Sequence, residues 1–162
     1  MKYRLCAHKG GIDPEDKGKG ADLSRLIKWW GRPNPWNPVG MAKYSHVEIQ
    51  RGRGDCFSAD GYYNVVRHKE IRFSHPDRWD FYDLGTYSTY EDDQIQWRCD
   101  QIEGHEYDYW GAFTCPWRGP GNHEKWYCSE AGLYVMGVGP TNQSPDMCVD
   151  TLIHYARNRG VR

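Results

Sequence analysis

Cys128 is the residue whose setting best suits nucleophilic chemistry. It lies in residues 126–137, which we expect to form a helix whose first turn carries the cysteine. Backbone N–H groups in the first turn of a helix lack partners within the helix, and the helix dipole is positive there. Both effects favour the thiolate, which is the nucleophilic form of cysteine. The alternative is that Cys128 is a small buried apolar side chain, as free cysteines often are.

His46 is the histidine best placed to serve a cysteine nucleophile as its base. It stands in residues 44–50, where Val47 and Ile49 alternate with His46 and Glu48, as in a strand with one buried face. Histidine is the usual base for a cysteine nucleophile, and a third polar group normally fixes its tautomer. A histidine on such a strand is more often exposed or structural. His46 alone therefore does not establish catalysis.

The elements that must position these two residues form one α+β domain over residues 1–162. Alternating apolar residues and turn residues predict strands, and apolar residues at helical spacing predict helices. Proline follows Ser144 where the last helix is expected to begin, which suits the first helical position. We expect strands at residues 2–7, 44–50, 56–60, 63–73 and 78–84, helices at 22–30, 91–103, 126–137 and 144–158, and loops at 10–20, 31–43 and 104–121.

Composition limits the classes of partner. The net charge of -1 gives no electrostatic reason to expect a nucleic acid or an anionic membrane. No run approaches the roughly 20 apolar residues of a membrane helix, and residues 1–10 lack the apolar segment of a signal peptide. We therefore expect a soluble cytoplasmic protein, or one in the host cytoplasm or a virion if a phage encodes it.

The cysteine and aromatic content indicates which cross-links, metal sites and ligands to expect. The six cysteines are scattered, so without a secretory signal we expect free thiols. Cys115, His123 and Cys128 lack the spacing of zinc ligands, and we expect neither a metal nor a cofactor. Eight Trp and twelve Tyr can fill a core, and some can line a groove for sugars, acyl chains or peptides.

The order of the motifs resembles a known family. Residues 44–49 read Tyr-Ser-His-Val-Glu-Ile, residues 107–111 read Tyr-Asp-Tyr-Trp-Gly, and residues 126–130 read Trp-Tyr-Cys-Ser-Glu. The histidine strand precedes the cysteine helix, and a Ser-Pro pair at 144–145 opens a final helix. This arrangement is similar to the circularly permuted papain-like cysteine hydrolases of the NlpC-type superfamily, in its YiiX-like and lecithin:retinol acyltransferase-like branches. The resemblance covers about residues 1–160.

The resemblance implies a fold and two catalytic roles. The fold is a small antiparallel sheet or barrel packed against helices, with the nucleophile at a helix N-terminus. Cys128 is then the nucleophile and His46 the general base. The family carries its third polar residue on the strand after the hairpin, where Ser58 is our first choice and Asp60 our second.

Other residues have open roles. Glu48 could orient His46 or be solvated, and we favour a solvated side chain. Tyr44 and Tyr127 could each donate a hydrogen bond to an oxyanion, although buried packing is the expected role of both. Glu130 is expected to brace the loop around the site.

The leading function is hydrolysis of an amide or ester bond, as in an amidase or peptidase, through a thioester acyl-enzyme. The expected substrates are a peptide, a peptidoglycan fragment or another acyl-containing molecule. One alternative is an acyltransferase that uses lipid or thioester donors, with an apolar groove lined by Trp29, Trp30 and the aromatics of residues 107–117. The other is a non-catalytic binding module on the same fold, which a serine at the third position would suit.

Overall fold

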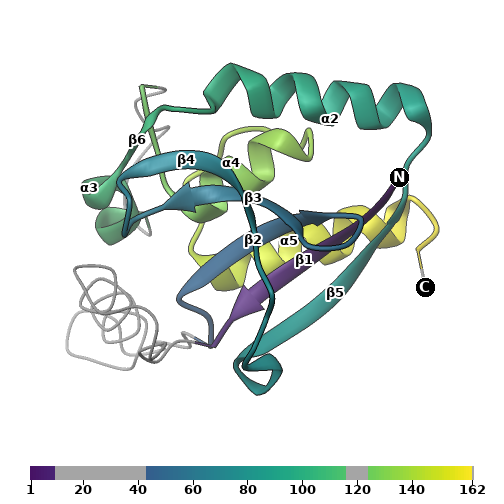
Figure 1. Ribbon diagram of the computed structural model, residues 1–162, viewed down its shortest axis with the longest axis horizontal. Coiled ribbons are helices and arrows are strands. Elements are labelled where there is room, and N and C mark those ends of the chain that lie inside the picture. The colour runs from purple at the N-terminus through teal and green to yellow at the C-terminus, as the bar shows by residue number, and fades with distance from the viewer. Residues whose placement is uncertain (10–42, 116–123, 162) are drawn as a thin grey trace.

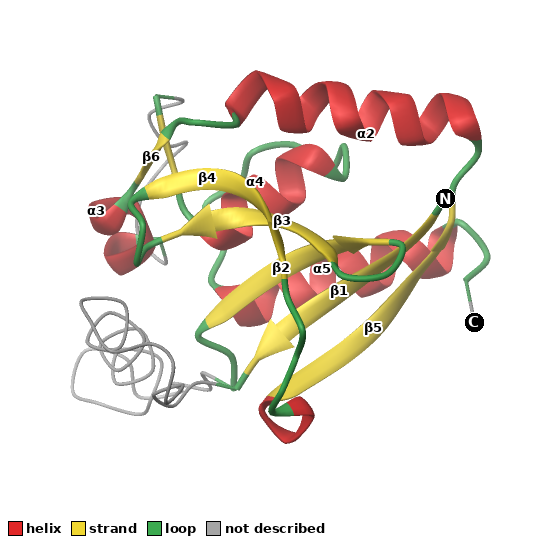
Figure 2. Ribbon diagram, viewed as in Figure 1, coloured by secondary structure: helices red, strands yellow, loops and turns green. Residues whose placement is uncertain are grey.

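The chain forms an open antiparallel sheet packed against helices. The computed structural model describes residues 1–9, 43–115 and 124–161 (Figure 1). The α+β class is confirmed. Within the described residues the five-stranded sheet is open and has the order β4-β3-β2-β1-β5, so it is not a barrel (Figure 2). The strands are β1 (Lys2–His8), β2 (His46–Arg51), β3 (Asp55–Asp60), β4 (Val65–Glu70) and β5 (Trp79–Thr86), and all their pairings are antiparallel.

The helices and a small second sheet complete the described structure. A 3-10 turn, η1 (Pro76–Arg78), precedes β5. The two-residue strands β6 (Glu106–Tyr107) and β7 (Lys125–Trp126) pair in parallel. The helices are α2 (Thr89–Ile102), α3 (Tyr109–Thr114), α4 (Cys128–Val135) and α5 (Pro145–Asn158).

One face of the sheet supplies the apolar core. Leu5 pairs with Ile49 in the β1–β2 register, and Ile49 pairs with Phe57 in the β2–β3 register. Paired residues project from the same face, so these three side chains form an apolar row across three strands. All three are buried. The row explains why the alternating residues 44–50 form a strand: its apolar side chains must face the helices.

Helix α4 lies at the centre of this packing. It contacts β2, β3, α2 and α5, and α2 lies outside it in Figure 1. Gly132 of α4 lies against the Ile49 side chain. Seven of its eight residues are buried. The helix is therefore held on several sides, and its first residue, Cys128, is fixed relative to β2.

Two helix starts show how local sequence sets the boundaries. Ser144 caps α5 by accepting a hydrogen bond from the Met147 N–H, and Pro145 occupies the first turn, as predicted. Helix α2 begins at Thr89, two residues before the predicted start. Ser88 and Glu91 form a capping box there, in which each side chain accepts a backbone hydrogen bond from the other residue.

Other boundaries differ from the sequence-based expectations. Strand β4 is shorter than the predicted 63–73 at both ends. It starts late because Asp60 accepts hydrogen bonds from the backbone N–H groups of Tyr62 and Tyr63 and turns the chain there. Residues 104–115 were predicted to be a connection but contain β6 and α3. The predicted helix at 22–30, Trp29 and Trp30, the loops at 10–20 and 31–42 and residues 116–121 lie outside the described residues.

Candidate active site

Cys128 is the first residue of α4. Tyr127 precedes it as the N-cap and makes no side-chain capping bond. The Ala131 N–H donates to the Tyr127 carbonyl, so Ala131 is the first residue whose N–H is satisfied in the helical pattern. The N–H groups of residues 128–130 therefore point out of the helix end without helical acceptors. The Cys128 side chain is buried beside these donors.

The structure brings His46, at the start of β2, into contact with Cys128. The two side chains lie close enough to interact electrostatically. His46 is partly accessible, with 21% of its side chain exposed. The two residues lie 82 positions apart in the sequence, and they meet because α4 packs directly on β2. A cysteine and a histidine in this contact can exchange a proton.

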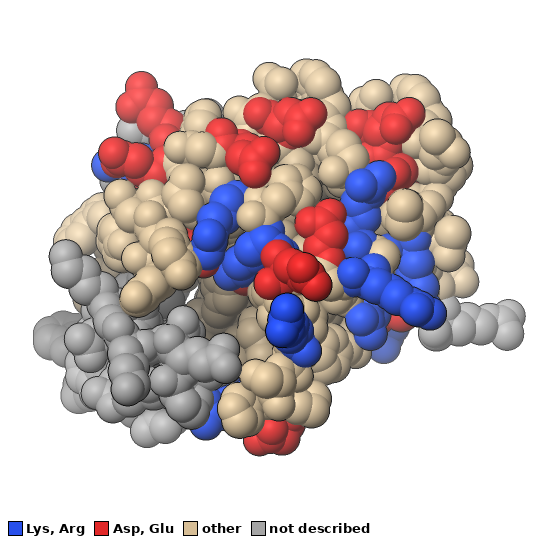
Figure 3. Space-filling view, in the orientation of Figure 1, with Lys and Arg blue, Asp and Glu red and all other residues tan. Residues whose placement is uncertain are grey.

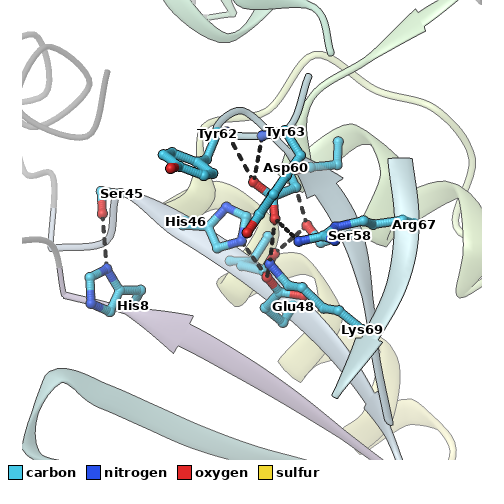
Figure 4. Close-up of polar contacts among 12 residues, drawn as sticks. His8, Ser45, His46, Glu48, Ser58, Asp60, Tyr62, Tyr63, Arg67 and Lys69 are labelled. Atoms are coloured by element: carbon cyan, nitrogen blue, oxygen red, sulfur yellow. Dashed lines mark hydrogen bonds and ion pairs between the residues drawn. The ribbon is translucent and has the colours of Figure 1, made fainter. Parts of the chain in front are cut away.

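Glu48 is the residue that holds the His46 ring. Nε2 of His46 lies 2.5 Å from Oε1 of Glu48 and donates to it (Figure 4). With Nε2 directed to Glu48, Nδ1 is the ring nitrogen left for Cys128. Glu48 is buried, so the expectation of a solvated side chain is wrong. Three polar groups thus follow one another in space: the Cys128 thiol, the His46 imidazole and the Glu48 carboxylate.

A second layer of charged residues surrounds Glu48. Lys69 of β4 places its Nζ 2.7 Å from Oε1 of Glu48 and 3.1 Å from Oδ2 of Asp60. Arg67 also contacts Asp60, with its guanidinium 3.0 Å from the same oxygen. Lys69 and Arg67 pair with Cys56 and Ser58 in the β3–β4 register, which places all four on one face. Figure 4 shows this network extending from His46 to Arg67.

The charges of the network oppose the effect of burial on its acids and bases. Burial lowers the pKa of His46, but the negative charges of Glu48 and Cys128 outweigh it and raise that pKa to about 10. Burial raises the pKa of Glu48, but Lys69 and then His46 hold it below its usual value. Burial likewise opposes the ionised form of Asp60, whose pKa Lys69 lowers to about 2. Together these charges favour the protonated form of the His46 imidazole.

Ser58, our first choice for the third residue, does not contact His46. Its hydroxyl donates to the Val47 carbonyl at 2.7 Å. The pairing of β2 with β3 covers only residues 49–51 and 55–57. Ser58 lies beyond it, and its hydroxyl binds the Val47 carbonyl, which that pairing does not include. Asp60, the second choice, also lacks a hydrogen bond to His46 in the described contacts and binds Lys69, Arg67 and the β3–β4 turn instead. Glu48, on the same strand as His46, makes the contact with His46 that was predicted for Ser58.

The remaining predicted support residues point elsewhere. The Tyr44 hydroxyl donates to Oδ2 of Asp80 at 2.7 Å and also contacts Tyr82. The Tyr127 hydroxyl donates to Oδ1 of Asn142 at 3.4 Å. Both rings are buried, in agreement with the packing role. Neither hydroxyl is therefore placed as an oxyanion donor. Glu130 is buried in the first turn of α4, where the helix dipole favours a carboxylate.

Sequence reasoning missed Lys69, Arg67 and the electrostatic interaction of Tyr107 with Cys128. The alternation of Arg67 and Lys69 along a strand was visible, but the carboxylate that Lys69 binds lies two strands away. Tyr107 is buried, and burial, with the negative charge of Cys128 as the next cause, raises its pKa well above the usual value. Its place in the motif at 107–111 was the available signal.

The described part of the chain holds neither a metal-binding cluster nor a helix that could cross a membrane. Residues 1–9, 43–115 and 124–161 contain no cluster of three or more His, Cys, Asp or Glu arranged to hold a metal ion. None of their helices combines the length and apolar character needed to cross a membrane. All six cysteines are described, free and buried. On the face in Figure 3, acidic side chains gather along α2 and basic ones over the strands below it, so neither sign covers the whole face.

Comparison with known proteins adds no relative. The sequence matches no family model, and the searches found no match among curated proteins or solved structures.

Proposed function

We propose that the protein is a cysteine hydrolase of the amidase or peptidase type, with Cys128 as nucleophile, His46 as general base and Glu48 as the group that orients His46. The observation that carries this proposal is the continuous contact from Cys128 through His46 to Glu48. A nucleophile, a base and an orienting group in hydrogen-bond contact are the parts that acyl transfer requires. The same order of elements is the basis for proposing a permuted papain-like relationship.

The first chemical step is formation of a thioester. The Cys128 proton passes to His46, and the thiolate attacks the carbonyl carbon of an amide or ester. The N–H groups at the start of α4 are the available donors for the negative oxygen that forms. His46 then returns its proton to the leaving amine or alcohol as the carbon–leaving-group bond breaks. The acyl group stays on Cys128.

Water completes hydrolysis. His46 takes a proton from water, the oxygen attacks the thioester, and Cys128 leaves as the thiolate. A peptide, a peptidoglycan fragment or another acyl-containing molecule is the proposed substrate class. If a second substrate replaces water, the same acyl-enzyme produces acyl transfer. Products formed with and without an added amine or alcohol acceptor distinguish these two reactions.

The proposal is tested with an activated ester such as p-nitrophenyl acetate. Cys128 should gain an acetyl group, detected by peptide mass spectrometry, faster than the other five cysteines, because His46 lies beside it and can take its proton. The His46→Gln variant should lose most of this rate, and Cys128→Ala all of it. Cys99→Ala is the matched control, since Cys99 lies in α2 away from His46.

Two results would reject the hydrolase. One is equal acetylation of all six cysteines. The other is a Cys128 rate that His46→Gln leaves unchanged. Either would favour the non-catalytic binding module, whose main sequence argument was a serine as third residue.

A further inference from the structure

Lys69 occupies an unusual place behind the candidate catalytic residues. It projects from β4, and its amino group reaches past β3 to Glu48 on β2. Its side chain is mostly buried, with 20% exposed, and it binds two buried carboxylates at 2.7 and 3.1 Å. Ordering a long lysine side chain costs conformational entropy, and burying its charge costs solvation. Contact with two carboxylates offsets both costs.

We propose that Lys69 is a positioning residue that keeps Glu48 ionised and thereby sets the pH range in which Cys128 and His46 form a thiolate–imidazolium pair. This inference rests on the proposed function and extends it to a residue that does not touch the substrate. Lys69 acts through Glu48, which in turn holds Nε2 of His46.

The Glu48 carboxylate depends on few partners. His46 and Lys69 both bind Oε1, whereas Oε2 is buried without a hydrogen-bond partner among the described residues. A buried carboxylate with so little compensation takes up a proton readily unless a cation lies beside it. A protonated Glu48 would no longer stabilise an imidazolium. Lys69 is the cation in direct contact that is not itself part of the proton exchange.

The direction of the effect follows from the charges around Glu48. Lys69 and Arg67 are positive, and Asp60 is negative. The groups that can gain or lose a proton here are Cys6 opposite Glu48 on β1, His46 on β2, Cys56 and Asp60 on β3, Tyr107 on β6 and Cys128 on α4. Removing the Lys69 charge makes each loss of a proton from this cluster less favourable. The thiolate should therefore appear only at higher pH.

The experiment measures the rate of Cys128 alkylation by iodoacetamide from pH 5 to pH 10, followed by peptide mass spectrometry. The rate reports the fraction of thiolate, and the reagent needs no knowledge of the substrate. For Lys69→Met we expect the acid side of the profile to move up by about one pH unit or more, which is about a tenfold lower rate on that side. Lys69→Arg should keep the wild-type profile, since it keeps the charge.

Two further variants make the result specific. Lys69→Gln can donate a hydrogen bond but carries no charge, so it should shift the profile as Lys69→Met does, and it replaces that variant if methionine prevents folding. Lys43→Met is the matched control. Lys43 lies before β2, is well exposed, and binds Asp80 of β5 at 2.6 Å instead of Glu48. It should leave the profile unchanged.

The outcomes separate this inference from the proposed function. If folded Lys69→Met and Lys69→Gln show the wild-type profile, Lys69 is a structural residue and the inference is wrong, while the hydrolase proposal stands. If wild-type Cys128 reacts no faster than the other cysteines at neutral pH, the proposed function fails first. A shift in both uncharged variants, with none in Lys69→Arg and Lys43→Met, supports the inference.

Discussion

Two carboxylates on the sheet each bind lysine at similar distances but lie in different surroundings. Glu48 on β2 binds Lys69 at 2.7 Å and His46 at 2.5 Å. Asp80 on β5 binds Lys9 at 2.8 Å, Lys43 at 2.6 Å and the Tyr44 hydroxyl at 2.7 Å. The Glu48 side chain is 0% exposed, whereas that of Asp80 is 25% exposed and its lysines more so.

The difference shows that burial, more than contact distance, decides what an ion pair can do. Water screens the charges around Asp80, so water can take the place of a partner that is lost. The charges around Glu48 lie where water does not replace a lost partner. Removing the Glu48 charge must therefore alter the protonation of its neighbours. Removing the Asp80 charge should alter its neighbours little, because water can solvate them. The catalytic proposal requires this property of the Glu48 cluster.

Neutralising Glu48 should have the largest effect on stability. Glu48→Gln leaves Lys69 and the protonated His46 with less compensation inside the protein. Removing one partner of a buried ion pair typically costs about 3–5 kcal/mol of unfolding free energy. Urea denaturation, followed by fluorescence, measures the loss. A decrease below about 1 kcal/mol would mean that the Glu48 cluster behaves like a surface pair.

Neutralising Asp80 should have a much smaller effect. Asp80→Asn keeps the size of the side chain, and an amide oxygen can still accept from Tyr44. An exposed ion pair contributes about 0–1 kcal/mol, so we expect a loss in this range in the same urea experiment. Added salt should reduce the difference between this variant and the wild type. A loss as large as that of Glu48→Gln would remove the contrast between the two clusters.

Local patterns in the sequence predicted the elements that bear Cys128 and His46. Alternation in residues 44–50 predicted β2, and apolar spacing after Cys128 predicted α4 to within two residues at either end. Both patterns arise from one buried face meeting one other layer. The roles of Cys128 and His46 in chemistry remain a proposal.

The position of Glu48 could not be predicted in the same way. Alternation placed it opposite Val47 and Ile49, which in a simple two-layer sheet is the solvated face. Instead Lys69, which pairs with Cys56, reaches over that face and buries the carboxylate. This contact depends on the register of three strands, which no local pattern reports. Strands β6 and β7 were missed for a related reason, since two residues show no periodicity.

The most direct test of the catalytic arrangement is the protonation state of His46, measured by 15N NMR of the imidazole nitrogens as a function of pH. His46→Gln identifies its signals among the seven histidines. Glu48 and the Cys128 thiolate raise the pKa of His46 to about 10. Both ring nitrogens should therefore remain protonated through neutral pH, and the ring should lose one proton only near pH 10. Removal of one negative neighbour in Cys128→Ala should lower this midpoint. A wild-type His46 that titrates near 6.5 and does not respond to Cys128→Ala would contradict the account.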